Sequence, residues 1–225
     1  MINFELERKA FTNDIIFIGV DEVGRGSWAG PLVATACWIN FKQYKALHKE
    51  INDSKKLTRN KRQEIILSLD NSTKFCGAIS SVKEIDVYGL TFANILAMKR
   101  SIFSLIKILN KYFVDKRFKF DIYIDGKYKP DFEEFDKLYK ISKLKLSPLN
   151  IIPIIRGDKI SKTIALASII AKETRDTIMR QYSLKYPNYL FHKHFGYGTV
   201  QHVEMISKYG ILDLHRKSFR PISTI

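Results

Sequence analysis

Cysteine, proline and long apolar runs are all scarce in this chain of 225 residues. The two cysteines, Cys37 and Cys76, do not have the spacing of a metal or redox motif, and their apolar neighbours favour buried packing thiols. No apolar run approaches the roughly 20 residues of a membrane-spanning helix. The first residues, MINFELERKAF, carry acids where a secretory signal has a basic region and then an apolar one. We therefore expect a cytoplasmic protein with no membrane span.

Acidic residues are also few compared with basic ones. The chain has 23 acidic against 38 basic side chains, which gives a formal net charge of +15. An excess of this size favours a polyanionic partner, above all a nucleic acid. The alternative is a lysine-rich composition that places lysine on every surface, and the abundant Ile, Lys and Asn keep that alternative open.

No repeat and no linker rich in Pro, Ser or Gly divides the chain, so we expect a single domain over 1–225, with about 181–225 forming a C-terminal extension. Its 45% of hydrophobic residues suffice for a core. Hydrophobic periodicity predicts strands at 15–22, 30–39, 72–80, 118–126 and 150–158, and helices at 60–70, 89–109, 162–182 and 199–209. The first two strands are expected to be antiparallel, and the later alternation of strand and helix predicts an α/β fold with a mixed sheet.

Carboxylates follow three of the predicted strands. The first ends in Asp21-Glu22, the fourth in Asp125, and the fifth in Gly157-Asp158. If these strands lie in one sheet and run the same way, their ends meet at one edge, where ligand sites of open α/β sheets are found. A single acid in such a place is more simply a solvated turn residue, but three strands that share the pattern indicate a site.

Converging carboxylates repel one another unless a cation lies between them. Oxygen ligands of this kind suit Mg²⁺ or Mn²⁺, and two such ions about 3.5–4 Å apart are the usual means of attacking a phosphodiester. Adjacent residues of a regular strand point to opposite faces, so Asp21 and Glu22 can share a site only if the backbone turns there, which Gly24 makes possible.

Motifs along nearly the whole chain resemble those of the ribonuclease HII family, the type 2 ribonucleases H. They are GVDEVGRGSWAGPLV (19–33), DSKKLT (53–58), IDG (124–126), GD (157–158), ALASIIAKETRD (165–176), YPNY (186–189), HFGYGT (194–199) and HRKSFRP (215–221). The resemblance implies a ribonuclease H-like fold, a five-stranded mixed sheet flanked by helices with a helical C-terminal appendage. It also implies an endonuclease that hydrolyses RNA in RNA–DNA hybrids and cuts 5′ of ribonucleotides embedded in duplex DNA, leaving 3′-hydroxyl and 5′-phosphate ends.

The resemblance assigns roles by position. Asp21, Glu22, Asp125 and Asp158 match the family's catalytic carboxylates and would hold two divalent ions, Mg²⁺ or Mn²⁺. Gly24, Arg25 and Gly26 match its ribonucleotide-reading loop, in which backbone groups reach the 2′-hydroxyl and the arginine binds a neighbouring phosphate. Tyr197 matches a tyrosine that packs against the sugar of the adjacent deoxynucleotide. Outside that motif, Tyr197 is more simply a core or turn residue.

Further substrate contacts are implied with less specific support. Ser54, Lys55 and Lys56 lie in a matching motif near the site, although solvated charge also explains the two lysines. Lys172 and Arg175, one helical turn apart, are expected to face the backbone of a duplex. The histidines of the matching motifs, His194 and His215, are expected to form structural hydrogen bonds, because Mg²⁺ prefers oxygen ligands.

Two features depart from the family pattern. Phe195 stands where the family commonly has lysine, so one phosphate contact is expected to be missing. The segment 127–150 is longer than in compact members and contains lysines 137, 140, 143 and 145. We interpret it as a solvated surface loop in preference to a DNA-gripping element.

Two other functions remain open on the residues alone. A catalytically silent hybrid-binding protein would keep the basic surface without the ions, but converging acids without ions would weaken its binding. A junction resolvase on the same fold would need the acids but not Gly24-Arg25-Gly26 or Tyr197. We expect a monomer whose partners are RNA–DNA hybrid and DNA with embedded ribonucleotides, and the C-terminal RPISTI is too weak a pattern to assign a replication clamp.

Overall fold

The computed structural model describes residues 2, 4–113, 119–132 and 149–225. Most of the lysine-rich segment, including lysines 137, 140, 143 and 145, therefore lies outside the described residues. The strands are β1 (Ile15–Val23), β2 (Leu32–Ile39), β3 (Thr73–Ser80), β4 (Lys119–Asp125) and β5 (Asn150–Ile154). The α-helices are α1 (Glu5–Thr12), α2 (Arg59–Leu67), α3 (Val82–Tyr112), α5 (Lys162–Lys185), α6 (Phe191–His194) and α7 (Val200–Tyr209). Short 3₁₀ turns are η1 (Phe41–Ala46), η2 (Ser54–Lys56), η4 (Gly157–Lys159), η5 (Pro187–Tyr189) and η6 (Ile222–Thr224).

The five strands form one mixed sheet in the order β3-β2-β1-β4-β5. The hairpin of β1 and β2 is antiparallel, as is the pair of β2 and β3. Strand β1 pairs in parallel with β4, and β4 pairs in parallel with β5. The prediction that the first two strands are antiparallel is confirmed, and the three strands followed by acids run the same way in one sheet, which was the condition for their ends to meet.

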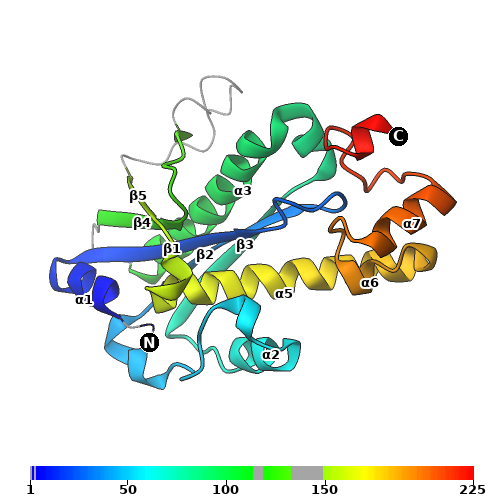
Figure 1. Cartoon of the computed structure of the whole chain (residues 1–225). Helices are drawn as coiled ribbons and strands as arrows, with labels where there is room; N and C mark the ends of the chain where they lie inside the picture. The colour runs from blue at the N-terminus through cyan, green and yellow to red at the C-terminus, as the bar shows by residue number, and fades with distance from the viewer. Residues whose placement is uncertain (1, 3, 114–118, 133–148) are drawn as a thin grey trace.

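Long helices cover the two faces of this sheet (Figure 1). On one face, α3 packs Ala97, Ile102 and Leu105 against a core that includes Val20 of β1 and Ile122 of β4. On the other face, the apolar residues of α5 pack with the end of β2 and with α2. The sheet is thus buried on both sides, which confirms the α/β fold with a five-stranded mixed sheet.

Helix boundaries differ from prediction at the start of α3. The helix predicted over 89–109 begins at Val82, because Ser81 and Glu84 form a capping box in which each side chain binds the other's backbone N–H. The helix is kinked at Gly89, which has φ of 79°. Thr58 is the N-cap of α2. Helix α1 has no counterpart among the predicted helices.

The part of the chain after α5 packs back onto that helix. Tyr189 and Phe191 are buried with Met179 of α5 and with Ala29, which lies in the connection between β1 and β2. This connection extends away from the rest of the sheet and meets the C-terminal segments near α6 and α7 (Figure 1). Among the described residues, no helix combines the length and apolarity needed to cross a bilayer. Cys37 is buried, Cys76 is half-buried, and both thiols are free.

Candidate active site

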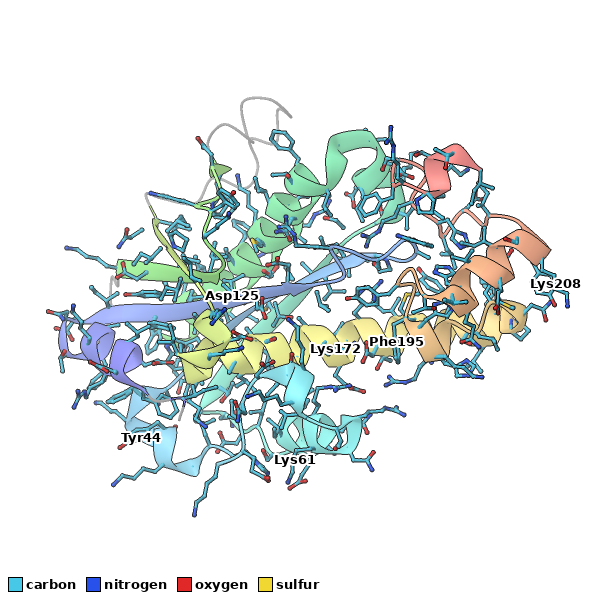
Figure 2. The ribbon with its side chains drawn as sticks, viewed as in Figure 1. Tyr44, Lys61, Asp125, Lys172, Phe195 and Lys208 are labelled. Atoms are coloured by element: carbon cyan, nitrogen blue, oxygen red, sulfur yellow. The ribbon has the colours of Figure 1, made fainter. Side chains whose placement is uncertain are left out.

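The four predicted carboxylates lie at one edge of the sheet. Asp21 and Glu22 are near the end of β1, Asp125 is the last residue of β4, and Asp158 lies in η4 just beyond β5. The backbone N–H of Gly157 donates a hydrogen bond of 2.6 Å to Asp125 Oδ1, which ties the end of β4 to the turn that carries Asp158. In Figure 2, Asp125 lies where β4 ends, over the first part of α5. The parallel strands therefore bring these side chains together, as the sequence indicated.

The backbone does not turn at Glu22, so the condition set for Asp21 and Glu22 to share one face is not met, and the chain leaves the strand only at Gly24. Strand β1 continues to Val23, and Asp21 and Glu22 pair regularly with Thr35 and Ala34 of β2. Adjacent strand residues alternate between faces. Asp21 accordingly hydrogen-bonds Ser168 of α5, whereas Glu22 lies 3.6 Å from the guanidinium of Arg25.

Asp125 is close enough to repel both Asp21 and Glu22, although these two residues lie on opposite faces of β1. Burial raises the pKa of Asp21 well above its ordinary value, and repulsion from Glu22 and Asp125 adds to the effect. Burial raises the pKa of Glu22 to about 7, against the opposing effect of Arg25 and with a further contribution from Asp125. The pKa of Asp158 is also raised, first by burial and then by repulsion from Asp125. Carboxylates in this arrangement retain protons unless a cation neutralises them.

The donor set fits a hard divalent cation. Glu22 Oε2 is buried and has no hydrogen-bond partner, so one carboxylate oxygen of this group lacks a protein donor. A buried carboxylate oxygen without a partner is costly, and an ion is one means of satisfying it. All four predicted ligands are carboxylates, which suit Mg²⁺ or Mn²⁺ better than softer metals.

Replacing Glu22 by glutamine should stabilise the metal-free protein increasingly as the pH rises from 4.5 to about 7. Because the pKa of Glu22 is higher in the folded chain, the folded chain binds this proton more tightly than the unfolded chain does. The wild type therefore loses stability across that window, and the glutamine variant does not. We expect the difference in melting temperature to reach on the order of 5 °C above pH 7 in chelator. A difference independent of pH would contradict this explanation.

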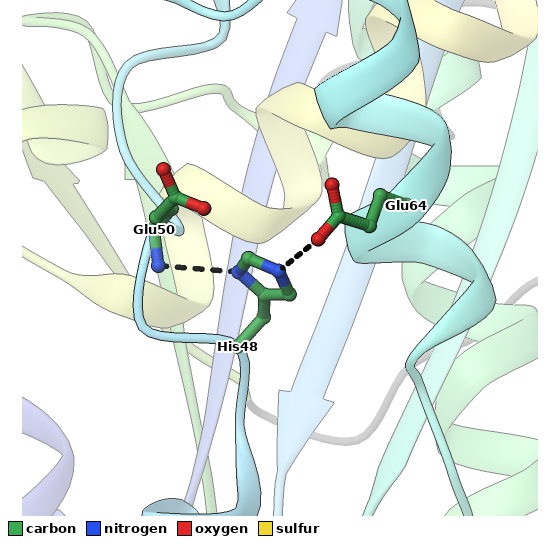
Figure 3. A group of neighbouring side chains, drawn as sticks. All are labelled: His48, Glu50 and Glu64. Atoms are coloured by element: carbon green, nitrogen blue, oxygen red, sulfur yellow. Dashed lines mark hydrogen bonds and ion pairs between the residues drawn. The ribbon is translucent and has the colours of Figure 1, made fainter.

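A different group of side chains comes closest together among the described residues. Ligand atoms of His48, Glu50 and Glu64 lie within 4.8 Å of one another (Figure 3). His48 Nδ1 accepts from the Glu50 backbone N–H at 3.2 Å, and its Nε2 lies 3.0 Å from Glu64 Oε1. Lys61 forms ion pairs with both glutamates. The lysine already supplies the positive charge, so this exposed group is a surface ion-pair network. Among the described residues, the four carboxylates of the sheet edge do not form a group as closely spaced as this one.

The loop Gly24-Arg25-Gly26 and Tyr197 lie close together. The next residue, Ser27, forms a β-bridge with Tyr197, and Ser27 Oγ donates to the Gly24 carbonyl at 2.9 Å. The structure thus places the two elements that the resemblance assigned to substrate reading beside each other and just beyond Glu22.

Three buried histidines support Tyr197. His202 Nδ1 lies 3.0 Å from the Tyr197 carbonyl, and His202 Nε2 lies 3.1 Å from His215 Nε2. The Leu212 backbone N–H donates to His215 Nδ1. One neutral tautomer of each ring satisfies these contacts, with His215 donating to His202 and His202 donating to Tyr197. Burial accordingly lowers the pKa of His202 to about 4, and His194 stacks on His202 at 4.3 Å.

Arg175 does not face a duplex, and this prediction requires correction. Its side chain is fully buried, and Nε donates to the Pro31 carbonyl at 2.9 Å. Its terminal nitrogens donate to the carbonyls of Phe195 and Ala29 and to Ser27 Oγ. Arg175 therefore fastens the loop to α5, with its donors directed to protein acceptors.

The other predicted contacts lie in two places. Ser54 is buried, and its hydroxyl lies 2.9 Å from that of Ser168, the residue that hydrogen-bonds Asp21. Lys55 and Lys56 are exposed, and Lys55 is near enough to Asp158 to oppose the rise in its pKa.

Lys172 lies farther along α5, beside Phe195 (Figure 2). Its ammonium group pairs with Asp176 at 2.7 Å and lies 4.9 Å from the centre of the Phe195 ring. A cation from α5 thus packs over the ring that replaces the family's lysine.

Three residues near the site were not predicted. Ser168 and Arg216 lie within motifs that carried the resemblance, and Asp53 begins one of them. Asp53 is buried and contributes to the raised pKa of Asp158. Their positions in those motifs could have indicated a role near the site. Their contacts could not be predicted, because the residues that they contact are far away in sequence.

Solved structures of ribonucleases H2 and HIII have a similar fold. Ribonuclease H2 from Pyrococcus horikoshii superimposes with a TM-score of 0.69 at 24% identity, covering 92% of this chain and 95% of that one. Bst-RNase HIII in complex with Mn²⁺ gives a TM-score of 0.70 at 17% identity, covering 93% of this chain and 68% of that one. The fold is therefore ribonuclease H-like, as predicted.

The sequence defines the family within that class. The family model described as Ribonuclease HII matches residues 18–222. A ribonuclease HII from Fusobacterium nucleatum is 40% identical over 203 residues, which cover 90% of this chain and 84% of the relative. This chain belongs to the ribonuclease HII family, and its activity is that of a ribonuclease H, an endonuclease that hydrolyses phosphodiesters.

Proposed function

We propose that this enzyme hydrolyses the RNA strand of RNA–DNA hybrids and cuts 5′ of single ribonucleotides embedded in duplex DNA, leaving 3′-hydroxyl and 5′-phosphate ends. The observation that carries the proposal is the contact between two elements. A sheet edge with Asp21, Glu22, Asp125 and Asp158 continues directly into a loop that is bridged to Tyr197. Chemistry and recognition of the sugar are then joined by one short stretch of backbone.

The four carboxylates would hold two divalent ions, Mg²⁺ or Mn²⁺. When bound, such ions activate the attacking water and stabilise the leaving 3′ oxygen. The protein's own contribution is to hold the ligands in place. Ser168 orients Asp21, the Gly157 N–H orients Asp125, and Arg25 pairs with Glu22. The raised pKa values of Asp21 and Glu22 mean that cation binding releases protons from the site.

Recognition of the substrate falls to the loop and Tyr197. Gly26 has no atom within 4 Å of the position that a Cβ would occupy, so its backbone is open to a close-approaching sugar. A 2′-hydroxyl both donates and accepts hydrogen bonds and distinguishes RNA from DNA at one nucleotide. Arg25, 47% exposed, is free to turn from Glu22 to a phosphate. Tyr197, half-buried over Arg175, presents a ring to the neighbouring sugar.

Substituting Tyr197 by alanine should slow cutting at a single embedded ribonucleotide more than cutting within a long hybrid. In a long hybrid many registers are productive, whereas a single ribonucleotide permits only one. The loss of one aligned contact should cost about 10- to 100-fold in kcat/KM on the single-ribonucleotide duplex. Tyr209→Ala removes an exposed ring of α7 and is the control. Equal losses on both substrates would assign Tyr197 to general binding or packing.

Binding should depend strongly on salt, because the +15 charge acts through release of counterions from phosphates. We expect the affinity for hybrid to fall about 10- to 1000-fold between roughly 50 and 200 mM salt. Lys55→Gln, near Asp158, should make the dependence shallower. Lys42→Gln should leave the salt dependence unchanged, because Lys42 lies in η1, which follows the end of β2 that is away from the carboxylates. A flat plot of log affinity against log salt would show that the lysines only decorate the surface.

The intact carboxylate set disfavours a silent hybrid-binding protein, because unneutralised acids at the sheet edge would repel phosphates. A junction resolvase would have no use for the contact between Ser27 and Tyr197. Incubation with Mg²⁺ and a DNA duplex that contains one ribonucleotide separates the three functions. Our proposal predicts a single cut 5′ of the ribonucleotide and none in all-DNA duplex or four-way junction.

A further inference from the structure

The loop after Glu22 is held between two C-terminal segments. On one side, the backbone N–H groups of Trp28 and Ala29 donate to the Gly196 carbonyl. On the other side, Ala29 bridges His215, the Gly30 N–H donates to Leu214, and the Arg216 N–H donates to Trp28. Residues 28–30 are therefore held by chain that lies more than 160 residues away in sequence.

Arg216 adds side-chain contacts to these. Its guanidinium is fully buried, and Nη1 donates to the carbonyl of Arg25 at 3.0 Å. Nε and Nη2 both donate to the carbonyl of Gly30, at 3.1 and 2.9 Å. One planar group thus spans the loop from Arg25 at its tip to Gly30 at its base.

Burying the guanidinium groups of Arg216 and Arg175 close together has an electrostatic free-energy cost. Burial, with a smaller contribution from the nearby cation of Arg175, lowers the pKa of Arg216 to about 9. Among the described residues, neither guanidinium is within ion-pair distance of a carboxylate. A buried cation without an ionic partner costs several kcal/mol by general estimates. A neutral apolar side chain would avoid that cost but could not donate three hydrogen bonds to two carbonyls from one planar group, which is the property of arginine that lysine lacks.

We propose that Arg216 is a positioning residue that fixes the Gly24-Arg25-Gly26 loop relative to Tyr197 and so determines how a single ribonucleotide is aligned for cutting. The inference rests on the proposed function of the loop. Arg216 does not touch the substrate in this account. It acts through the Arg25 carbonyl, while Arg175 anchors the other side of the same loop through Ala29 and Ser27.

Arg216→Lys tests the proposal, because it keeps a long basic side chain with N–H donors and loses the planar fork. We expect kcat/KM on a single-ribonucleotide duplex to fall about 10-fold or more, with a smaller fall on long hybrid. The matched control is Arg62→Lys, which alters another buried arginine that binds Glu173 and Asp176 of α5 rather than the loop. The control should lower stability without changing the ratio of the kcat/KM values for the two substrates.

A fluorescence measurement tests the positioning without reference to activity. Trp28 lies in the loop and Trp38 lies in the core, and the chain has no other tryptophan. In a Trp38→Phe background, Trp28 emission should be quenched by acrylamide roughly twofold more strongly after Arg216→Lys and unchanged after Arg62→Lys. If the wild type does not cut at single ribonucleotides but quenching changes as expected, the proposed function fails and the positioning stands.

Other outcomes would overturn the inference. If Arg216→Lys changed neither the quenching of Trp28 nor the ratio of kcat/KM values for the two substrates, Arg216 would not fix the position of the loop. Arg216→Gln, which keeps two N–H donors without the charge, serves if the lysine variant does not fold. Failure of both variants to fold would assign Arg216 to the stability of the whole domain and would equally contradict a local role.

Discussion

Asp125→Asn is expected to abolish cleavage while the protein remains folded and still binds RNA–DNA hybrid. Asp125 is the carboxylate that acts on Asp21, Glu22 and Asp158 alike, so it is central to the predicted metal site. The loss of ion-mediated stabilisation is worth several kcal/mol, or about three orders of magnitude in rate. Folding should be retained, because the substitution removes repulsion and leaves an amide oxygen at this position able to accept from the Gly157 N–H.

The control is Asp121→Asn on the same strand. Asp121 lies earlier in β4, where it accepts a hydrogen bond from Asn150 at the surface. Single-turnover cleavage in saturating Mg²⁺, circular dichroism and hybrid binding should be measured for both variants. Near-normal turnover by Asp125→Asn would refute the assignment of the site, whereas lost turnover in Asp121→Asn would show that the strand itself is sensitive.

The glycines of the loop should give two different results. A Cβ at Gly24 would collide with the Arg175 side chain, and φ of 93° at Gly24 is strained for alanine. Gly24→Ala should therefore lower both stability and activity. A Cβ at Gly26 meets nothing within 4 Å in the free protein. Gly26→Ala should melt like the wild type, so that any loss of activity comes from the substrate.

For Gly26→Ala we expect kcat/KM on the single-ribonucleotide duplex to fall about 100-fold. The physical reason is that a methyl group would occupy the space through which backbone groups approach the 2′-hydroxyl. The measurement pairs steady-state kinetics with thermal melts for both glycine variants. Full activity in Gly26→Ala would mean that the loop reads the ribonucleotide elsewhere.

The sequence was sufficient to predict which acids meet. Each follows a β-branched, apolar strand, and parallel strands in one sheet deliver their ends to one edge. What the sequence did not predict correctly was the local backbone conformation at Glu22. Glu22 was expected to need a turn, yet β1 remains regular and Asp125 lies close enough to affect residues on both faces.

The environment of the arginines could not be predicted. Helical spacing placed Arg175 beside Lys172, and spacing alone does not distinguish a solvated arginine from one whose donors are all bound. Arg175 donates hydrogen bonds to the backbone carbonyls of Ala29, Pro31 and Phe195. These carbonyls come together only in the folded chain. The start of α3 was also missed, because the predicted helix began at Gly89, which is a kink inside α3.

The most direct test of the account is the cleavage pattern on one DNA duplex that carries a single ribonucleotide. With Mg²⁺ or Mn²⁺ the wild-type enzyme should make one cut 5′ of that ribonucleotide, leaving a 3′-hydroxyl and a 5′-phosphate, and should leave the all-DNA duplex intact. Binding without a cut, or cuts that do not depend on the position of the ribonucleotide, would contradict the proposal that the sheet-edge carboxylates and the adjoining loop act together.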